Sequence, residues 1–452
     1  MPLFKGLSKL TIKPPAAGKV KLVLQAALLF AVGFLLGVNL IIPLLLVCAL
    51  LYLKRSSKDY NLLNLSLLFV IIFTASHFII KQGQPLYYIP FAAVAMLAAI
   101  LFEELPLSLL VTLLSSFSVG YLARDVDAAI LFSISGMFSI VFVRGARKRM
   151  TLIRAGLAIG LIQAAALFFI DHYGMDYPQR YLLFVVNGAV SSIIVLGVLP
   201  IFEYLFKTVT NISLLELADF SQPLLQRMMM EAPGTYHHSL IVGNLSEAAC
   251  SAVGANALLA RIGAYYHDIG KLEKPEYFSE NQELQTSKHE ALTPTMSKMV
   301  IMNHVNGGLE LAKKYKLNAR LVDFIKQHHG TSLVYYFYRR ALENQEENDQ
   351  AIKEEGFRYP GPKPNTKETA IVLLADSVEA ASRALKEPTP ANIKDVVYNI
   401  INNKFIDGQL DECDLTLKDL EKISAVFVRI LSGIFHARIA YPGNHTGSGE
   451  PH

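Results

Sequence analysis

Residues 181–206 read YLLFVVNGAVSSIIVLGVLPIFEYLF, an apolar run that is long enough to cross a bilayer as one helix. A spanning helix needs about 20 apolar residues, because each residue advances it by about 1.5 Å. Upstream of this run the sequence stays apolar, whereas downstream of Lys207 it has ordinary globular composition. The 452-residue chain therefore divides near residue 207 into a membrane half and a second, charged half.

Further apolar runs precede this span and are separated by short segments with turn or charged residues. They predict spans at 61–80, 86–102, 105–123, 127–143 and 151–170. The run at 20–53 is too long for one span. If it crosses twice, with a turn near Asn39, the transmembrane domain covers 20–207 and has about eight helices. A single crossing, with seven spans and an external N-terminus, is the alternative.

The basic residues between the spans predict the orientation, because short cytoplasmic loops are enriched in Lys and Arg. The densest clusters lie at 144–154 and 54–58, and counting spans places both on the same side of the membrane. That side is expected to be the cytoplasm, which then also holds a basic arm at 1–19 and everything after Lys207. Residues 208–233 are expected to form a juxtamembrane linker of amphipathic helices interrupted at Pro223 and Pro233.

Isolated polar residues within the predicted spans allow two interpretations. His77 and Gln163 either form a ligand or proton site or bond to a neighbouring helix or interface, and the second reading is favoured. The spans lack the repeated acidic or arginine pattern that a pump or channel would need.

Histidines beside carboxylates mark the second half of the chain. Seven of the twelve histidines fall between residues 237 and 329, whereas the three cysteines are far apart and show no thiolate zinc spacing. Imidazole and carboxylate together suit Mn, Fe or Zn. Adjacent His267 and Asp268 can flank two neighbouring metals, which would activate a shared water for attack on a phosphate ester. Lys271, one turn later, can add positive charge at a substrate phosphate.

The sequence around this pair resembles a known family. His267 to Lys271 (HDIGK) matches the HD-domain signature, and the flanking stretches EAPGTYHHSLIVGNLSEAA (231–249), VDFIKQHHGTSLVYYFY (322–338) and FRYPGPKPNTKETAIVLLADSVEAASR (357–383) are more specific. Together with NGAVSSIIVLGVLPIFEYLF (187–206), they resemble the seven-transmembrane-receptor HD hydrolases, the PgpH-type bacterial phosphodiesterases of cyclic di-AMP. The resemblance implies an all-α fold, with a polytopic helical bundle followed by a cytoplasmic HD domain at 234–442. The residues after Pro442 are expected to form a disordered tail at 443–452.

The same resemblance implies a centre of two divalent transition metals, manganese or iron. The implied ligands of one metal are His238, His267, Asp268 and Asp376, and those of the second are His304, His328 and His329, with Asp268 bridging. The implied catalytic residues are His267, Asp268 and Lys271. His237 is the less suitable histidine of its pair, and His289 occupies a pocket position where the family motif is altered. Glu379 and Arg383 are explained by a helix ion pair and stay outside the catalytic set.

The implied reaction is hydrolysis of cyclic di-AMP to pApA by a metal-bridged hydroxide at the cell membrane. Cyclic di-GMP is the rival substrate, but the Gly-Tyr-Pro signature of its HD enzymes does not occur here. A nucleotide-binding receptor without turnover is the rival function. No nucleic-acid polymer is expected as a partner.

Two expectations concern segments outside the site. The family's extracellular sensor domain between its first two spans is expected to be missing near Asn39. The spans would then sense lipid or a small apolar ligand, or would only anchor the chain and support a homodimer. Residues 341–366 are expected to form an exposed loop between catalytic helices.

Overall fold

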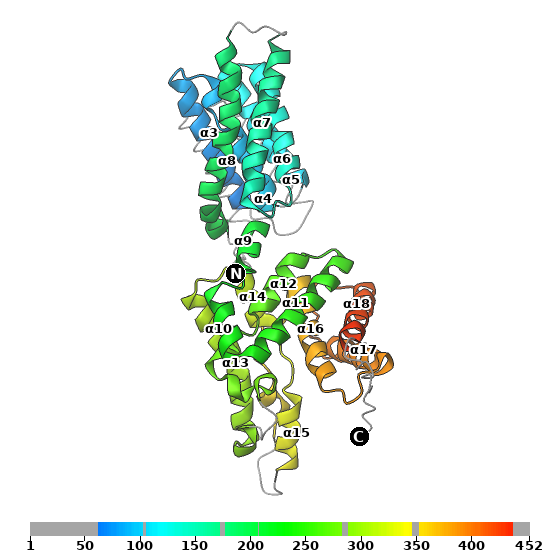
Figure 1. Ribbon diagram of the computed structural model, residues 1–452. Helices are drawn as coiled ribbons and strands as arrows, with labels where there is room; N and C mark the ends of the chain where they lie inside the picture. Colours follow the sequence, from blue (N-terminus) through cyan, green and yellow to red (C-terminus); the bar gives the residue numbers. More distant parts are fainter. Residues whose placement is uncertain are drawn as a thin grey trace, which may run out of the picture. The chain divides into compact units, whose positions relative to one another are not determined.

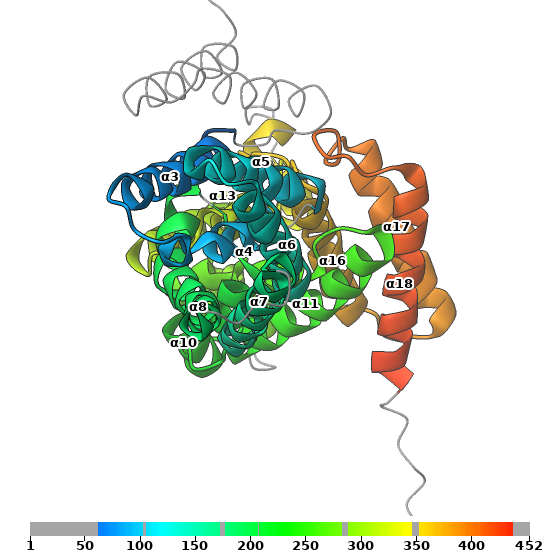
Figure 2. The same cartoon turned by 90° about the horizontal axis from the view of Figure 1, so that it is seen from above.

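The computed structural model describes residues 62–102, 105–171, 177–206, 208–282, 288–345 and 352–436. These residues form helices joined by short connections, and their one isolated β-bridge joins Leu333 and Arg358. The chain splits into two compact units, Met1–Ile212 and Ser213–His452, which are described separately (Figures 1 and 2). The all-α fold is confirmed, with apolar helices of membrane length followed by a helical unit.

The described part of the first unit is a bundle of helices that run alongside one another (Figure 1). Four of these helices are long and apolar enough to cross a membrane: α5 (Leu105–Ala123), α6 (Val126–Val143), α7 (Arg149–Ile170) and α8 (Pro178–Phe206). Two further apolar helices, α3 (Leu62–Lys81) and α4 (Phe91–Phe102), lie at two more of the predicted spans. The run at 20–53 lies outside the described residues.

The region predicted as a span at 86–102 is not one continuous α-helix. It begins with the 3₁₀ turn η1 (Leu86–Tyr88), and only the 12 residues of α4 are α-helical. Pro85 precedes the turn and Pro90 precedes α4. Because proline has no backbone N–H and fixes its own φ angle, it favours the start of a helix and disfavours its interior.

Close packing and one polar contact join the later helices of the bundle. A Cβ added at Gly156 of α7 would lie 2.6 Å from the carbonyl oxygen of Gly188 in α8, so only glycine permits this approach. Gln163 Nε2 donates a hydrogen bond to Ser135 Oγ of α6 at 2.8 Å. Gln163 is therefore bonded to a neighbouring helix, in agreement with the favoured reading.

The second unit is built from α-helices and short 3₁₀ turns. Its α-helices are α10 (Pro223–Glu231), α11 (Pro233–Val253), α12 (Ala257–Tyr266), α13 (Pro294–Lys314), α14 (Ala319–Gln327), α15 (Tyr335–Glu343), α16 (Lys367–Arg383), α17 (Pro390–Ile406) and α18 (Leu417–His436). The 3₁₀ turns are η2 (Ile269–Glu273), η3 (Pro275–Tyr277), η4 (Ser279–Asn281), η5 (Lys288–Ala291) and η6 (Glu354–Phe357). The short helix α9 (Asn211–Leu217) contains the boundary between the two units.

Helix α16 is the central element of the second unit. Its residues from Thr369 to Asp376 are all buried, and it packs against α11, α12, α14 and α17. Helices α17 and α18 lie side by side at one edge of this unit (Figures 1 and 2). A buried central helix holds its side chains in fixed positions, which suits it to carry part of a site.

The predicted linker at 208–233 is partly built into this unit. Pro223 and Pro233 each occupy the first turn of a helix, where the missing N–H costs no hydrogen bond. Leu224, Leu225 and Met228 of α10 are buried. The prolines therefore begin helices, and α10 belongs to the fold of the second unit.

The expectation of an exposed loop at 341–366 is wrong for residues 357–359. Phe357 and Tyr359 are only 6% and 8% exposed. Arg358 Nη2 lies 2.7 Å from Asp407 Oδ1. The polar composition of the segment predicted exposure, but burying one aromatic side chain stabilises a fold by about 2 kcal/mol. This gain favours the burial of Phe357 and Tyr359. Residues 346–351 lie outside the described part.

Candidate metal centre

Five helices bring the predicted ligands to one place in the second unit. His238 lies in α11, His304 in α13 and Asp376 in α16, and all three are buried. The HD pair directly follows α12 and the pair at 328–329 directly follows α14. Residues that directly follow a helix are not constrained to the helical spacing of side chains. Two adjacent residues at each of these helix ends can therefore reach the same cluster.

The cluster consists of two groups that share Asp268. One group is His238, His267, Asp268 and Asp376, and the other is Asp268, His304, His328 and His329. Within each group the possible ligand atoms lie within 4.8 Å of one another. These groups have the same members as the two ligand sets that the sequence resemblance implies.

The two oxygens of Asp268 face different histidines. Oδ2 lies 3.2 Å from His267 Nε2 and 3.5 Å from His238 Nε2. Oδ1 lies 3.4 Å from His304 Nε2 and 3.5 Å from His328 Nε2. A carboxylate in this position can donate one oxygen to each of two metal ions, as the bridging ligand of a binuclear site does.

Unsatisfied polar atoms at the centre of the cluster fit bound cations. Among the described residues, His267 Nε2 and Asp268 Oδ1 are buried and make no hydrogen bond. A buried polar atom without a partner destabilises a fold unless something else binds it. The two groups are consistent with a binuclear metal site made of imidazole and carboxylate ligands.

Backbone carbonyls orient three of the histidine rings. The Nδ1 atoms of His267, His304 and His328 lie 2.6, 2.5 and 3.0 Å from the carbonyl oxygens of Ala264, Ile301 and Ile325. A carbonyl accepts a hydrogen bond, so Nδ1 carries a proton, which leaves Nε2 as the ring atom that can bind a metal. The same arrangement orients histidines that bind metals in other proteins.

His238 is oriented by a carboxylate on another helix. Its Nδ1 lies 2.5 Å from Glu379 Oε2, and its Nε2 lies 3.0 Å from Asp376 Oδ1. Glu379 is also 3.1 Å from Arg383 Nε, so the expected helix ion pair exists but describes only half of its contacts. No sequence pattern pairs Glu379 with a residue 141 positions away, although Glu379 follows Asp376 by one turn on the same face of α16.

Burial and neighbouring charges shift the pKa values of these groups in different directions. Burial alone would lower the pKa of His267, but Asp268 outweighs it and raises this pKa to about 10. Burial, helped by the neighbouring His328, lowers the pKa of His304 to about 4 against the attraction of Asp268. His304 is therefore neutral at pH 7, as a ligand must be. Burial alone would raise the pKa of Asp268, but His267 and Lys271 outweigh it and hold that pKa well below its usual value.

Lys271 contacts two carboxylates. Its Nζ lies 2.8 Å from Asp268 Oδ2 and 2.7 Å from Glu280 Oε1, and the side chain is 12% exposed. Burial opposes its charge, but Asp268 and Glu280 outweigh this and raise the pKa of Lys271. Its ammonium thus balances the charge of Asp268 from the side of η2.

The remaining candidate histidines lie outside both groups. His237 is exposed, whereas its neighbour His238 is buried. His289 Nε2 lies 2.8 Å from the carbonyl oxygen of Tyr277, and its ring packs against Phe337. Tyr359 is a site neighbour that the sequence analysis missed, because its ring stacks on His329 with centroids 4.3 Å apart.

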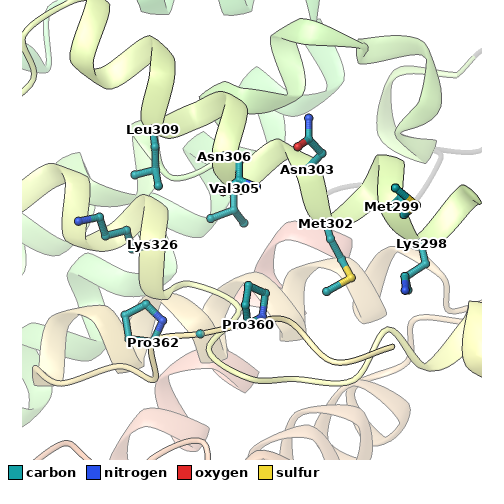
Figure 3. Close-up of a pocket in the computed structure, with 11 residues that line it drawn as sticks. Lys298, Met299, Met302, Asn303, Val305, Asn306, Leu309, Lys326, Pro360 and Pro362 are labelled. Atoms are coloured by element: carbon teal, nitrogen blue, oxygen red, sulfur yellow. The ribbon is translucent and has the colours of Figure 1, made fainter. Parts of the chain in front are cut away.

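A separate groove lies on another face of α13 (Figure 3). It has a volume of about 610 Å³, and Met302, Val305 and Leu309 line it opposite Pro360 and Pro362. No residue of the two ligand groups lines it. The groove is therefore distinct from the metal centre.

Comparison with known families decides the classification. The family model described as 7TM receptor with intracellular HD hydrolase matches residues 32–210, and the HD domain model matches residues 235–381. The chain belongs to this 7TM–HD hydrolase family. Its helices of membrane length make it a multi-pass membrane protein. Its second unit contains an HD domain with two His/Asp clusters that are suited to bind metal.

Two relatives of this 7TM–HD hydrolase are named as cyclic-di-AMP phosphodiesterases. Cyclic-di-AMP phosphodiesterase PgpH of Bacillus subtilis (strain 168) is 39% identical over 428 residues, which cover 90% of this chain and 60% of the relative. The protein of the same name from Listeria monocytogenes (serotype 1/2a, strain 10403S) is 38% identical over 389 residues, which cover 84% of this chain and 53% of the relative. The chain thus spans somewhat more than half the length of these relatives. The family assignment made from the sequence motifs is confirmed.

A solved structure also matches the HD part of the chain. The L. monocytogenes PgpH HD domain in complex with cyclic-di-AMP is 45% identical, with 48% of this chain and 99% of that chain covered and a TM-score of 0.46.

Proposed function

We propose that this chain is a membrane-bound, metal-dependent phosphodiesterase that hydrolyses cyclic di-AMP to pApA. The observation that carries the proposal is Asp268, whose two oxygens face two different pairs of histidines within an HD domain. The substrate is proposed because both curated PgpH relatives are named as cyclic-di-AMP phosphodiesterases.

Some side chains of the site would bind the metal ions, and Lys271 would balance charge. Two divalent ions, for which we propose Mn²⁺ or Fe²⁺, would activate water and neutralise charge on the attacked phosphate. Asp268 places one oxygen toward each ligand group, and Asp376 completes the group of His238 and His267. Lys271 balances the negative charge of Asp268, and we propose that it also favours the approach of a phosphate.

We further propose that the catalytic unit lies in the cytoplasm. The connection between α6 and α7 carries Arg144, Arg147 and Lys148, and basic residues favour cytoplasmic loops. Large apolar side chains of the membrane unit, such as Phe117, Phe169 and Ile193, are more than 60% exposed in this structure. We propose that they contact lipid, since such surfaces are unfavourable in water.

Product identification tests the proposed reaction. Purified full-length chain with Mn²⁺ should convert cyclic di-AMP to pApA, as detected by mass spectrometry, and Asp268→Ala should abolish the conversion. The variant should keep the melting temperature of the wild-type chain and should still insert into detergent micelles. Preferential cleavage of cyclic di-GMP would refute the substrate, and binding of cyclic di-AMP without cleavage by the wild-type chain would favour a receptor.

A further inference from the structure

The turn that follows the ligand pair His328 and His329 is held by residues that lie beyond the HD match. The backbone N–H of Thr331 donates to Gln409 Oε1 at 2.8 Å, and Gln409 Nε2 donates to Thr331 Oγ1 at 2.9 Å. Lys404 Nζ of α17 donates to Ser332 Oγ at 2.6 Å. The matched HD region ends at residue 381, so α17 and the loop after it add contacts to the site from outside that match.

Lys404 is linked to the metal centre through this turn. The backbone N–H of Tyr359 donates to the carbonyl oxygen of Ser332 at 3.0 Å, and the Tyr359 ring stacks on His329. Lys404 is therefore connected to a predicted metal ligand through two neighbouring residues. Burial lowers the pKa of Lys404 although Asp376 and Asp407 act in the opposite direction, so the ammonium is poorly solvated and within electrostatic reach of Asp376.

The two carboxylates whose charges act on Lys404, Asp376 and Asp407, already have other partners. Both oxygens of Asp407 accept hydrogen bonds from Arg358, at 2.7 and 3.1 Å. Asp376 Oδ1 lies 3.0 Å from His238 Nε2, and its Oδ2 lies 3.6 Å from His329 Nδ1. Among the described residues, Lys404 has no carboxylate within 4 Å, and the hydroxyl of Ser332 is its hydrogen-bond partner. A partly buried cation without a counter-ion is unfavourable unless it serves to bind an anion.

We propose that the Lys404 ammonium binds a phosphate of the substrate, namely the phosphodiester of the cyclic dinucleotide that is not being cleaved. This assignment rests on the proposed function. A cyclic dinucleotide carries two negatively charged phosphodiesters, and the metal centre can neutralise the one under attack. The second must enter the same site, where it needs its own cation. Lysine is a common phosphate ligand because its compact charge can form up to three hydrogen bonds.

A comparison of two substrates tests the assignment. Cyclic di-AMP has two phosphodiesters, whereas bis(4-nitrophenyl) phosphate has one and needs only the metal centre. In Mn²⁺-loaded full-length protein, Lys404→Met should raise KM for cyclic di-AMP by about 10- to 100-fold, which corresponds to the loss of one charge-assisted hydrogen bond. Its kcat/KM for the single-phosphate ester and its metal content should stay within about twofold of wild type.

Two further variants act as controls. Lys404→Arg restores the positive charge and should recover most of the affinity for cyclic di-AMP. Lys394→Met removes an exposed lysine from the same helix and should leave KM unchanged.

Three results would overturn the assignment. An equal loss with both substrates, or a loss of metal from Lys404→Met, would mean that Lys404 only supports the turn at 330–332. An unchanged KM for cyclic di-AMP would mean that it binds no phosphate. If the wild-type chain cleaves the model ester but neither cyclic di-AMP nor cyclic di-GMP, the proposed function itself fails, and the assignment of Lys404 falls with it.

Discussion

The Nδ1 atom of His238 lies 2.5 Å from Oε2 of Glu379, a residue of α16. Asp376, one turn earlier on the same helix, contacts the other nitrogen of this ring. A single turn of α16 therefore supplies a predicted metal ligand and also orients the histidine beside it. The other three histidines with oriented Nδ1 atoms use carbonyls near their own positions in sequence.

Removing Glu379 should weaken metal binding without unfolding the domain. A carboxylate behind a ligating histidine fixes its tautomer and raises its basicity, and its loss typically lowers metal affinity by about 10- to 100-fold. Glu379→Ala should show this loss in a competition titration with a chelator, and Glu379→Gln should show a smaller one because an amide oxygen can still accept the hydrogen bond. Arg383→Met is the control, since Arg383 is 37% exposed and contacts only the other oxygen of Glu379. Wild-type affinity in Glu379→Ala would contradict the proposed orientation of His238.

Metal stoichiometry should distinguish shared from unshared ligands. Because Asp268 belongs to both groups, Asp268→Ala should lower the content of both metal ions. His304→Ala changes one group and should leave about one ion per chain, and His267→Ala should do the same for the other group. Inductively coupled plasma mass spectrometry of the purified chains measures this directly. Equal metal loss in all three variants would argue against two separable ions.

Gly270 of the HDIGK motif should not tolerate a side chain. A Cβ at this position would lie 1.7 Å from the carbonyl oxygen of His304 and 2.4 Å from the backbone nitrogen of Gly308. Helix α13 would have to move away and take His304 with it, so Gly270→Ala should destabilise the fold by about 3 kcal/mol and reduce metal binding. Thermal unfolding of the two chains measures the difference. Gly433→Ala in α18 is the matched control, because nothing lies within 4 Å of its added Cβ, and an unchanged melting temperature in Gly270→Ala would refute this close contact.

The Glu280–Lys271 pair should contribute to stability above acidic pH. Burial alone would raise the pKa of Glu280, but the Lys271 ammonium outweighs it and lowers this pKa from 4.5 to about 2. Since the unfolded chain takes up the proton at higher pH, the stabilisation is complete above about pH 4.5 and is lost as the pH falls toward 2. Its full size is about 3 kcal/mol by linkage.

The acid dependence of unfolding checks this contribution. For metal-free protein in detergent, Glu280→Gln should lower the melting temperature at pH 7 and should reduce the fall of melting temperature between about pH 4.5 and 2. Glu412→Gln, at an exposed position, should behave like wild type. A Glu280→Gln chain whose acid profile matches that of wild type would show that the pair does not stabilise the fold.

The amino-acid sequence by itself determined the class of this protein and the membership of its cluster. Apolar runs of membrane length require helices, because a bilayer offers no other partner for backbone polar groups. The HDIGK motif and the histidine pairs identified the chemistry, because few residue types bind divalent metals. The exposed loop expected at 341–366 failed at Phe357 and Tyr359, since polarity of a segment does not reveal where its few aromatic side chains pack.

Only the tertiary structure decided which groups act together. Glu379 and His238 are 141 residues apart, and Lys404 and Ser332 are 72 apart, so no local pattern could have paired them. The two-sided position of Asp268 likewise depends on histidines from four helices meeting around it. Hydrogen bonds and ion pairs act between groups a few ångströms apart in space, whereas sequence motifs show only which residues are neighbours along the chain. For this reason the ligand residues could be predicted from motifs, but the contacts of Glu379 and Lys404 could not.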